Sequence, residues 1–218
     1  MDRNRAPIAV EGVPFVAATA IISVLFYVFC WIIPAVIFFA LTLFIIWFFR
    51  NPERKIPSGK NLIISPADGK IIDISNGVEE RILKRRMTKI SIFMNVFNVH
   101  INRVPCSGRI FDVIYNKGKF ISANMEKASL ENEQNAVVLE MPSGGKILFV
   151  QIAGLIARRI VCWIKKGESV EIGQRFGLIR FGSRVDVYLP GDAEVKVTMG
   201  QKVKGGESIL AILNETKV

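Results

Sequence analysis

The chain has 218 residues, of which half are hydrophobic, and 29 basic against 19 acidic residues give it a net charge of +10. This length allows one domain of ordinary size with a smaller addition. The single histidine and the three cysteines, which form no Cys-x-x-Cys pair, exclude a usual zinc site and a disulfide framework, and they favour a reducing compartment.

An uncharged apolar run dominates the start of the chain. No charged residue occurs from Gly12 to Phe49, and Pro34 lies near the middle of this stretch. The run is too long for one perpendicular span of a hydrocarbon core about 30 Å thick, and a proline interrupts helical hydrogen bonding. We therefore expect a membrane-associated helical hairpin, with helices over about 13–32 and 35–49. A single tilted or re-entrant helix and a cleavable signal peptide are the alternatives.

Basic residues flank this run, with Arg3 and Arg5 before it and Arg50 and Arg54 after it. The positive-inside tendency therefore predicts that both ends of the hairpin, and the residues that follow, lie on the cytoplasmic side. Basic clusters later in the chain lack the interleaved aromatic residues that stack on bases, so anionic membrane lipid rather than nucleic acid is the predicted partner. A solvated basic face without a specific partner is the alternative.

The character of the chain changes after the apolar run. Residues 51–61, "NPERKIPSGKN", form a polar linker with two prolines, and short β-type runs separated by Gly, Asn and Pro follow. We expect strands at 62–65, 70–75, 89–94, 108–114, 136–141, 146–154, 158–163, 175–181, 184–189, 193–198 and 208–213, and a turn or loop at 130–135. The sequence therefore predicts a single, mainly β domain over residues 51–218, preceded by the hydrophobic hairpin of residues 1–50.

Two Gly-containing segments near the C-terminus, 171–179 and 198–212, are similar to the closing strands of the small β modules that carry lipoyl or biotinyl groups. Those carriers need a lysine at an exposed hairpin tip, in contexts such as Asp-Lys-Ala or Met-Lys-Met, and no such triplet occurs here. We therefore expect lipoyl/biotinyl-like hairpins as architecture, while a membrane-tethered carrier module stays an alternative function.

Two motifs carry candidate acid–base residues. Asp68 lies in "SPADGKI", where Pro66 and Gly69 favour a turn. His100, the only histidine, lies in "NVHINRVP" near Arg103, and imidazole is the usual proton shuttle near neutral pH. An ordinary turn and a structural or exposed histidine are the alternatives.

A third motif joins two strand-like runs at Gly182 and Ser183 without a hairpin spacer. A β-bulge is the usual reason for such a pair. Chemistry offers another, because a serine hydroxyl can attack the preceding carbonyl, and Gly, which has no Cβ, obstructs that approach least. The N-to-O acyl shift gives an ester, β-elimination then breaks the chain, and the dehydroalanine left at the new N-terminus hydrolyses to a pyruvoyl group.

Five motifs in this order resemble those of the phosphatidylserine decarboxylases, in their short, membrane-bound bacterial form. They are "PADGK" (66–70), "FMNVFNVHINRVP" (93–105), "YNKGKF" (115–120), "ENEQN" (131–135) and "FGSRVDVYLP" (181–190). The resemblance covers essentially all of residues 60–190, and the apolar hairpin fits the short form too.

The resemblance implies a self-processing zymogen of phospholipid biosynthesis. Autocatalytic cleavage between Gly182 and Ser183 would leave a β chain of residues 1–182 and an α chain of residues 183–218, which begins with the pyruvoyl group made from Ser183. No metal and no pyridoxal phosphate would then be required. Asp68 would assist self-cleavage or proton transfer.

The implied enzyme is a carboxy-lyase at the bacterial cytoplasmic (inner) membrane, with the catalytic domain on the cytoplasmic side. Its pyruvoyl ketone would form a Schiff base with the amine of phosphatidylserine, accept the electron pair left by carbon dioxide, and release phosphatidylethanolamine. The implied partners are phosphatidylserine, anionic membrane lipid and the two chains of one precursor, and homo-oligomers are left open. A non-enzymatic anionic-lipid adaptor is the remaining alternative.

Two positions depart from the pattern of longer family members. Those members carry His-x-x-His-x-Pro, whereas this chain has Arg103 in place of the second histidine, which is associated there with self-cleavage. Arg103 could instead hold a substrate anion, since a guanidinium stays protonated. Arg184 follows the serine, where longer members favour Ser or Thr. Whether His100 serves self-cleavage, turnover or both therefore stays open.

Overall fold

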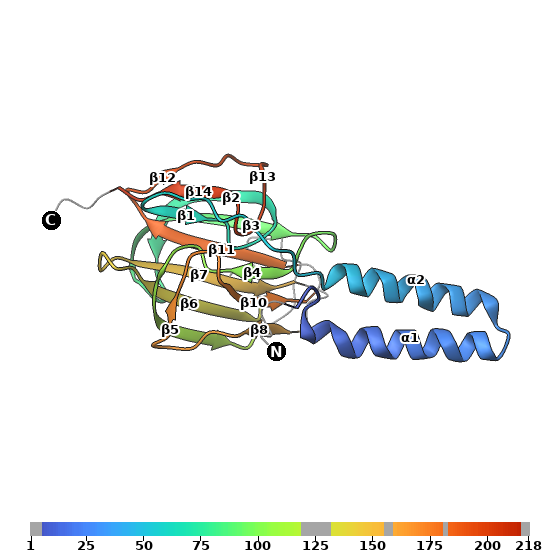
Figure 1. Ribbon diagram of the computed structural model, residues 1–218. Helices are drawn as coiled ribbons and strands as arrows, with labels where there is room; N and C mark the ends of the chain where they lie inside the picture. Colours follow the sequence, from blue (N-terminus) through green and yellow to red (C-terminus); the bar gives the residue numbers. More distant parts are fainter. Residues whose placement is uncertain (1–5, 119–131, 155–158, 181–182, 215–218) are drawn as a thin grey trace. The chain divides into compact units, whose positions relative to one another are not determined.

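The computed structural model describes residues 6–118, 132–154, 159–180 and 183–214. The chain divides into two compact units, Met1–Glu53 and Arg54–Val218. The first unit is a helical hairpin and the second is built from strands, so the predicted mainly β fold with an N-terminal helical pair is confirmed (Figure 1). The lipoyl- or biotinyl-like character of its hairpins is not confirmed.

The hairpin of the first unit turns at a different place from the one expected. After a short 3-10 turn, Val10–Gly12, come helices α1 (Val13–Val28) and α2 (Ile32–Phe48). The predicted break at Pro34 is wrong, because Pro34 lies in the first turn of α2. A proline is tolerated there, since the N–H groups of a first turn have no helical partner. The chain reverses instead at Cys30, which has a left-handed φ of 58°.

Two hydroxyl contacts join α1 to α2. The Ser23 hydroxyl donates to the carbonyl of Ala35 at 2.8 Å, and the Thr42 hydroxyl donates to the Thr19 hydroxyl at 2.9 Å. Most large apolar side chains of both helices are exposed. The helical stretch Val10–Val28 is long and apolar enough to cross a membrane, by length and composition alone, whereas α2 falls short of that length.

The second unit is built from antiparallel strands. Their bounds are β1 Leu62–Ile64, β2 Gly69–Glu79, β3 Arg85–Met94, β4 Ile101–Arg103, β5 Gly108–Asn116, β6 Gln134–Glu140, β7 Lys146–Ala153, β8 Ile160–Cys162, β9 Ser169–Val170, β10 Arg175–Ile179, β11 Ser183–Pro190, β12 Glu194–Val195, β13 Lys202–Val203 and β14 Ile209–Ile212. Among the described residues they form an eight-stranded sheet of order β13-β2-β3-β11-β7-β6-β5-β9 and two three-stranded sheets, β1-β14-β12 and β4-β10-β8.

The main core lies on one face of the eight-stranded sheet. Fully buried aliphatic side chains from β3, β6, β7 and β11 pack there with Phe149 and Phe176, whose rings meet edge to face at 4.9 Å. Because side chains alternate along a strand, Ser183, Val185 and Val187 of β11 share this core face. A smaller apolar cluster, which includes Val150 and Ile152, covers the opposite face, called here the outer face.

The longer strands and the short strands β1, β8 and β12 overlap predicted strands. The short strands β4, β9 and β13 were not predicted, because segments of two or three residues show little alternation. The loop expected at 130–135 is wrong at its end, since Gln134 and Asn135 begin β6. Residues 130 and 131 lie outside the described residues.

Gly69 allows the close approach of β2 to β3. A Cβ atom at Gly69 would lie 2.3 Å from the Phe93 carbonyl oxygen, whereas one at Gly77, in the same strand, would meet nothing within 4 Å. We expect Gly69→Ala to lower the free energy of unfolding by about 1–3 kcal/mol, the usual effect of overpacking. Gly77→Ala is the matched control and should unfold like the wild type or slightly later in a thermal melt. Equal melting of the two variants would contradict this account of β2.

Candidate active site

Ser183 is fully buried at the start of the central strand β11. In the antiparallel register it lies opposite Met94, the last residue of β3, and opposite Ala153, the last residue of β7. Its hydroxyl donates to the Met94 sulfur at 3.4 Å. A thioether is a weak acceptor, so this contact leaves the hydroxyl oxygen available for other chemistry. Gly182, the other half of the predicted cleavage site, lies outside the described residues.

Buried amide side chains gather around this end of β11. The amide nitrogen of Asn102 reaches the Met94 sulfur at 3.7 Å, and its oxygen accepts a bond from Gln151 at 2.9 Å. Asn135 donates to Gln151 at 3.0 Å, and Asn132 donates to the carbonyl of Ala153 at 2.7 Å. All four amides are at most 3% exposed. A polar cluster of this kind is unusual in a β core, where burying a polar group is costly unless it is hydrogen-bonded.

His100 directly precedes β4 and stands two residues before Asn102. Its ring is buried, and Nδ1 lies 3.0 Å from the carbonyl oxygen of Asn98. A carbonyl can only accept, so Nδ1 carries the proton in the neutral ring, and Nε2 is the nitrogen with the lone pair. Asn102, on β4, contacts Met94, which also contacts Ser183. His100, which directly precedes β4, therefore lies at the same end of the domain as Ser183.

Asp68 is bound by an arginine and a backbone amide rather than by His100. Arg54 donates to both carboxylate oxygens, at 3.1 and 2.8 Å, and the Gly205 amide donates to Oδ1 at 2.7 Å. Arg54 also lies 3.6 Å from Glu207. The Asp68 carboxylate thus ties the loop before β2 to the turn before β14.

Arg103 is buried at the end of β4 and makes structural contacts on both sides. Its guanidinium donates to the carbonyl of Gly173 at 2.9 Å, and its backbone N–H donates to the carbonyl of Pro66 at 2.8 Å. Arg103 therefore links the loop of residues 66–69, called here the "ADG" loop, to the turn before β10. A role in holding a substrate anion stays a prediction.

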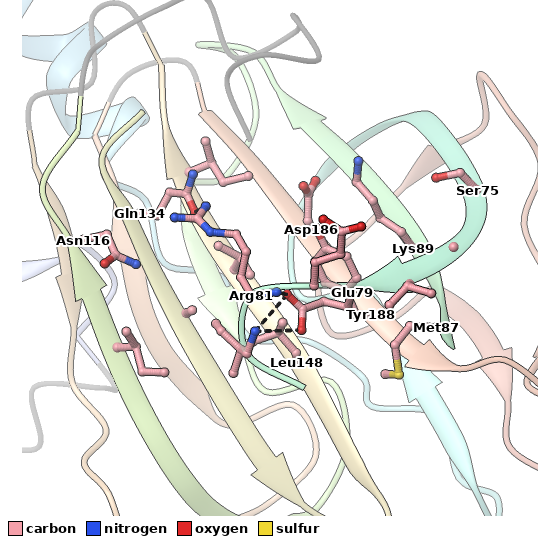
Figure 2. A pocket seen from close by; sticks show the side chains of 18 of the residues that line it. Ser75, Glu79, Arg81, Met87, Lys89, Asn116, Gln134, Leu148, Asp186 and Tyr188 are labelled. Atoms are coloured by element: carbon pink, nitrogen blue, oxygen red, sulfur yellow. Dashed lines mark hydrogen bonds between the residues drawn. The ribbon is translucent and has the colours of Figure 1, made fainter. Parts of the chain in front are cut away.

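A cavity of about 510 Å³ lies on the outer face of the eight-stranded sheet. Figure 2 shows Glu79, Arg81 and Lys89 around it, together with Asp186 and Tyr188 of β11. Burial, and then the neighbouring Asp186 carboxylate, raise the pKa of the Tyr188 hydroxyl. Side chains of β11 alternate between faces, so this cavity lies across the sheet from Ser183.

The sequence of this chain matches the family model of phosphatidylserine decarboxylase over residues 41–211. The chain belongs to the phosphatidylserine decarboxylase family. A phosphatidylserine decarboxylase proenzyme from Geotalea uraniireducens is 53% identical over 213 residues, which cover 98% of this chain and all of the relative. Proenzymes of the same name from Syntrophus aciditrophicus and Syntrophotalea carbinolica are 52% and 49% identical, over 93% and 98% of this chain.

Family membership directs attention to groups around Ser183 that the motifs did not single out. Asn102, Asn135 and Gln151 were not predicted as site residues, although the first two lie inside two of the motifs. The signal in the sequence is an amide within an apolar strand, as Gln151 is within "ILFVQIA". In the described part of this decarboxylase-family chain, no group of three or more His, Cys, Asp or Glu side chains is placed to hold a metal ion.

Proposed function

We propose that this chain decarboxylates phosphatidylserine to phosphatidylethanolamine through a pyruvoyl group made from Ser183, after self-cleavage between Gly182 and Ser183. One observation carries the proposal beyond family membership. Ser183 is fully buried at the start of a strand paired on both sides, and its hydroxyl is held only by a thioether among the hydrogen bonds between described residues. A serine kept for stability alone would be expected to have a stronger acceptor.

Self-cleavage needs no reagent from outside except water. The Ser183 oxygen attacks the carbonyl carbon of Gly182, the C–N bond breaks, and the proton of the hydroxyl ends on the freed amine. Loss of the Ser183 α-proton then expels the Gly182 carboxylate from Cβ and leaves dehydroalanine. Water converts the dehydroalanine to a ketone and releases ammonia, so that the α chain begins with the pyruvoyl group.

His100 is the residue that we assign to proton transfer. The bond between Nδ1 and the Asn98 carbonyl orients the ring and leaves Nε2 as the basic nitrogen. Asp68, which is bound by Arg54 and Gly205, is assigned the positioning of the "ADG" loop. This loop in turn contacts β4 through the Arg103 N–H.

The pyruvoyl group supplies a ketone that condenses with the substrate amine and withdraws electrons from the carbon that loses carbon dioxide. The residues present fit such a group. Ser183 and Ala153 are fully buried, so the group would lie inside the domain, and the buried amides supply donors at this end of the domain. Because the group comes from the chain itself, activity is expected without added metal or pyridoxal phosphate.

The hydrophobic hairpin is proposed to hold the enzyme at the cytoplasmic face of the membrane, where the serine headgroup is. Its exposed apolar side chains include Trp31 and Ile33, at 62% and 76%. Large exposed apolar surfaces on a monomer mark interaction or membrane sites. Phosphatidylserine and anionic lipid are the proposed ligands. The proposal does not depend on whether the chain forms homo-oligomers.

Cleavage itself is the first test of this proposal. Purified protein should run as two fragments, and intact mass should assign the smaller to residues 183–218 with a ketone-bearing N-terminus. Ser183→Ala should remain a single chain of about 24.4 kDa without decarboxylase activity, because alanine has no oxygen to attack with. A wild type that is active as one uncleaved chain, as a carrier module or lipid adaptor would be uncleaved, contradicts the proposal.

The role of His100 is separated from that of Asp68 by a time course of fragment appearance beside carbon dioxide release. We expect His100→Ala to slow cleavage by about 10²-fold to 10⁴-fold, the usual loss for a general base. Asp68→Asn and Arg54→Met should slow cleavage to the same extent as each other, because they break the same ion pair. Both should slow it less than His100→Ala does. Normal cleavage with a dead mature enzyme would assign His100 to turnover alone. Much slower self-cleavage of Asp68→Asn than of Arg54→Met would show that the carboxylate itself transfers a proton.

Deletion of residues 1–50 tests the hairpin. The remaining β domain should still cleave itself, because the contacts of Ser183 come from β3 and β7. It should turn over short-chain, soluble phosphatidylserine at nearly the full rate and the lipid in vesicles far more slowly. Full activity on vesicles would show that the hairpin is dispensable for access to the substrate.

A further inference from the structure

Three buried amides form a head-to-tail line of hydrogen bonds that ends beside Ser183. Asn135 Nδ2 donates to Gln151 Oε1 at 3.0 Å, and Gln151 Nε2 donates to Asn102 Oδ1 at 2.9 Å. Asn102 Nδ2 then points to the Met94 sulfur, at 3.7 Å, which also accepts from Ser183. Every donor in the line faces toward Ser183, and every acceptor faces away from it.

The Met94 sulfur determines the direction of this line. A thioether has no hydrogen to donate, so the Asn102 group that faces it must be the NH₂ and not the oxygen. The oxygen of Asn102 is then turned to Gln151 and needs a donor there, which orients Gln151, and the same reasoning orients Asn135. Hydrogen bonds in a chain polarise one another, so the last N–H is a stronger donor than an isolated amide.

The fold makes space for this line at Gly177. A Cβ atom at this position, on β10, would lie 2.2 Å from the carbonyl oxygen of Val161 and 3.1 Å from Gln151 Nε2. Asn102 lies opposite Gly177 in the β4–β10 pair, so the missing side chain leaves room for the bond between the two amides. The three amides belong to three strands: β6 and β7 are neighbours in sequence and pair with each other, and β4 comes from an earlier part of the chain.

We propose that Asn135, Gln151 and Asn102 are a positioning line that presents an N–H donor to the Ser183 site, and that the direction of this line sets the rate at which Ser183 is converted. This inference rests on the proposed function of Ser183. Asn102 acts on Ser183 through Met94 in the precursor, so all three amides are positioning residues. Their expected target is the negative charge that develops on oxygen when Ser183 attacks, since such charge is stabilised by donors already in place.

Gln151→Glu reverses the bond between positions 151 and 102 with almost no change in shape, while Asn135 can still donate to position 151. An ionised carboxylate at position 151 can only accept, so Asn102 must turn its NH₂ toward that position and its oxygen toward Met94. At about pH 8 we expect self-cleavage to be at least about tenfold slower than in the wild type. This factor corresponds to the loss of one hydrogen bond. At about pH 5.5 the protonated carboxyl of the variant donates to Asn102 again, since burial favours the neutral form, and the rate should recover.

The rate is measured on the full chain, made by cell-free translation in the presence of lipid vesicles and followed on a denaturing gel. Cys162, whose thiol hydrogen-bonds with Asn135 and whose pKa is raised by burial, stays protonated over this range. His100 is present in the variant and in the wild type, so the two are compared as the ratio of their rates at each pH.

Gln134→Glu is the matched control. Gln134 is 5% exposed, is the neighbour of Asn135 in β6, and accepts a bond from Arg81 on the outer face of the sheet. The Gln134→Glu variant should cleave itself at the wild-type rate at both pH values. A pH-dependent loss confined to Gln151→Glu supports the proposal, because a loss of packing alone would not recover on acidification.

Gln151→Met decides whatever the ionisation of a buried carboxyl at position 151, since it breaks the line without a charge. It should fold, as a thermal melt checks, and cleave slowly at both pH values. Cleavage of folded Gln151→Met within about twofold of the wild type at both pH values would overturn the proposal, given the net value of a hydrogen bond. A wild type that is not cleaved before Ser183 would instead refute the proposed function itself.

Discussion

The register of β11 is the constraint on which the candidate site depends. A slip of one residue in a strand turns every side chain to the other face of the sheet. On the outer face, Arg184 donates to Asp186 at 2.6 Å and to Ser91 of β3 at 2.8 Å, and the Arg184 and Asp186 side chains are at most 2% exposed. A slipped strand would move these buried charges into the apolar core and away from Ser91, which is very costly. The outer face thereby holds Ser183 opposite Met94.

The same pairing explains how the proposed cleavage can leave a folded protein. Residues 183–218 contain β11 to β14, and β11 pairs with β3 and β7, β13 with β2, and β14 with β1. Only the β12–β14 pair lies within that segment among the described strands. Asp68 adds a side-chain contact to Gly205, and the Gly206 N–H donates to the Ser65 carbonyl. The two proposed chains are thus parts of the same sheets, and cutting one peptide bond removes few of the contacts between them.

The sequence predicted what depends on local pattern and missed what depends on contact between distant strands. Alternation predicted a strand at 184–189, to which the structure adds Ser183 as the first residue, and charge patterning located the hairpin. Pro34 misled because proline breaks a helix interior but is tolerated in a first turn, and a one-dimensional pattern does not reveal which applies. Gly182 and Ser183 were singled out by chemistry and family resemblance, and their roles remain predictions.

The partners of the acid–base candidates were beyond the reach of the sequence. Asp68 and His100 were both predicted as acid–base candidates, yet Asp68 binds Arg54, which lies in a stretch predicted as a linker. Asn135 lay in a segment predicted as a loop. The contacts of Asp68 with Arg54 and of Asn135 with Gln151 form only when the chain folds, so no spacing in the sequence encodes them.

The buried amides place stability and function in opposition at one end of this core. Replacing a hydrogen-bonded buried pair by apolar groups of the same shape can be neutral or stabilising, and Gly177, which makes room for Gln151, leaves β10 without a side chain to pack there. A sequence shaped by stability alone would have aliphatic residues at Asn102 and Gln151, as it has at Val185 beside them. Their presence next to a serine held by a thioether is therefore better explained by the chemistry of that serine than by the packing of the sheet.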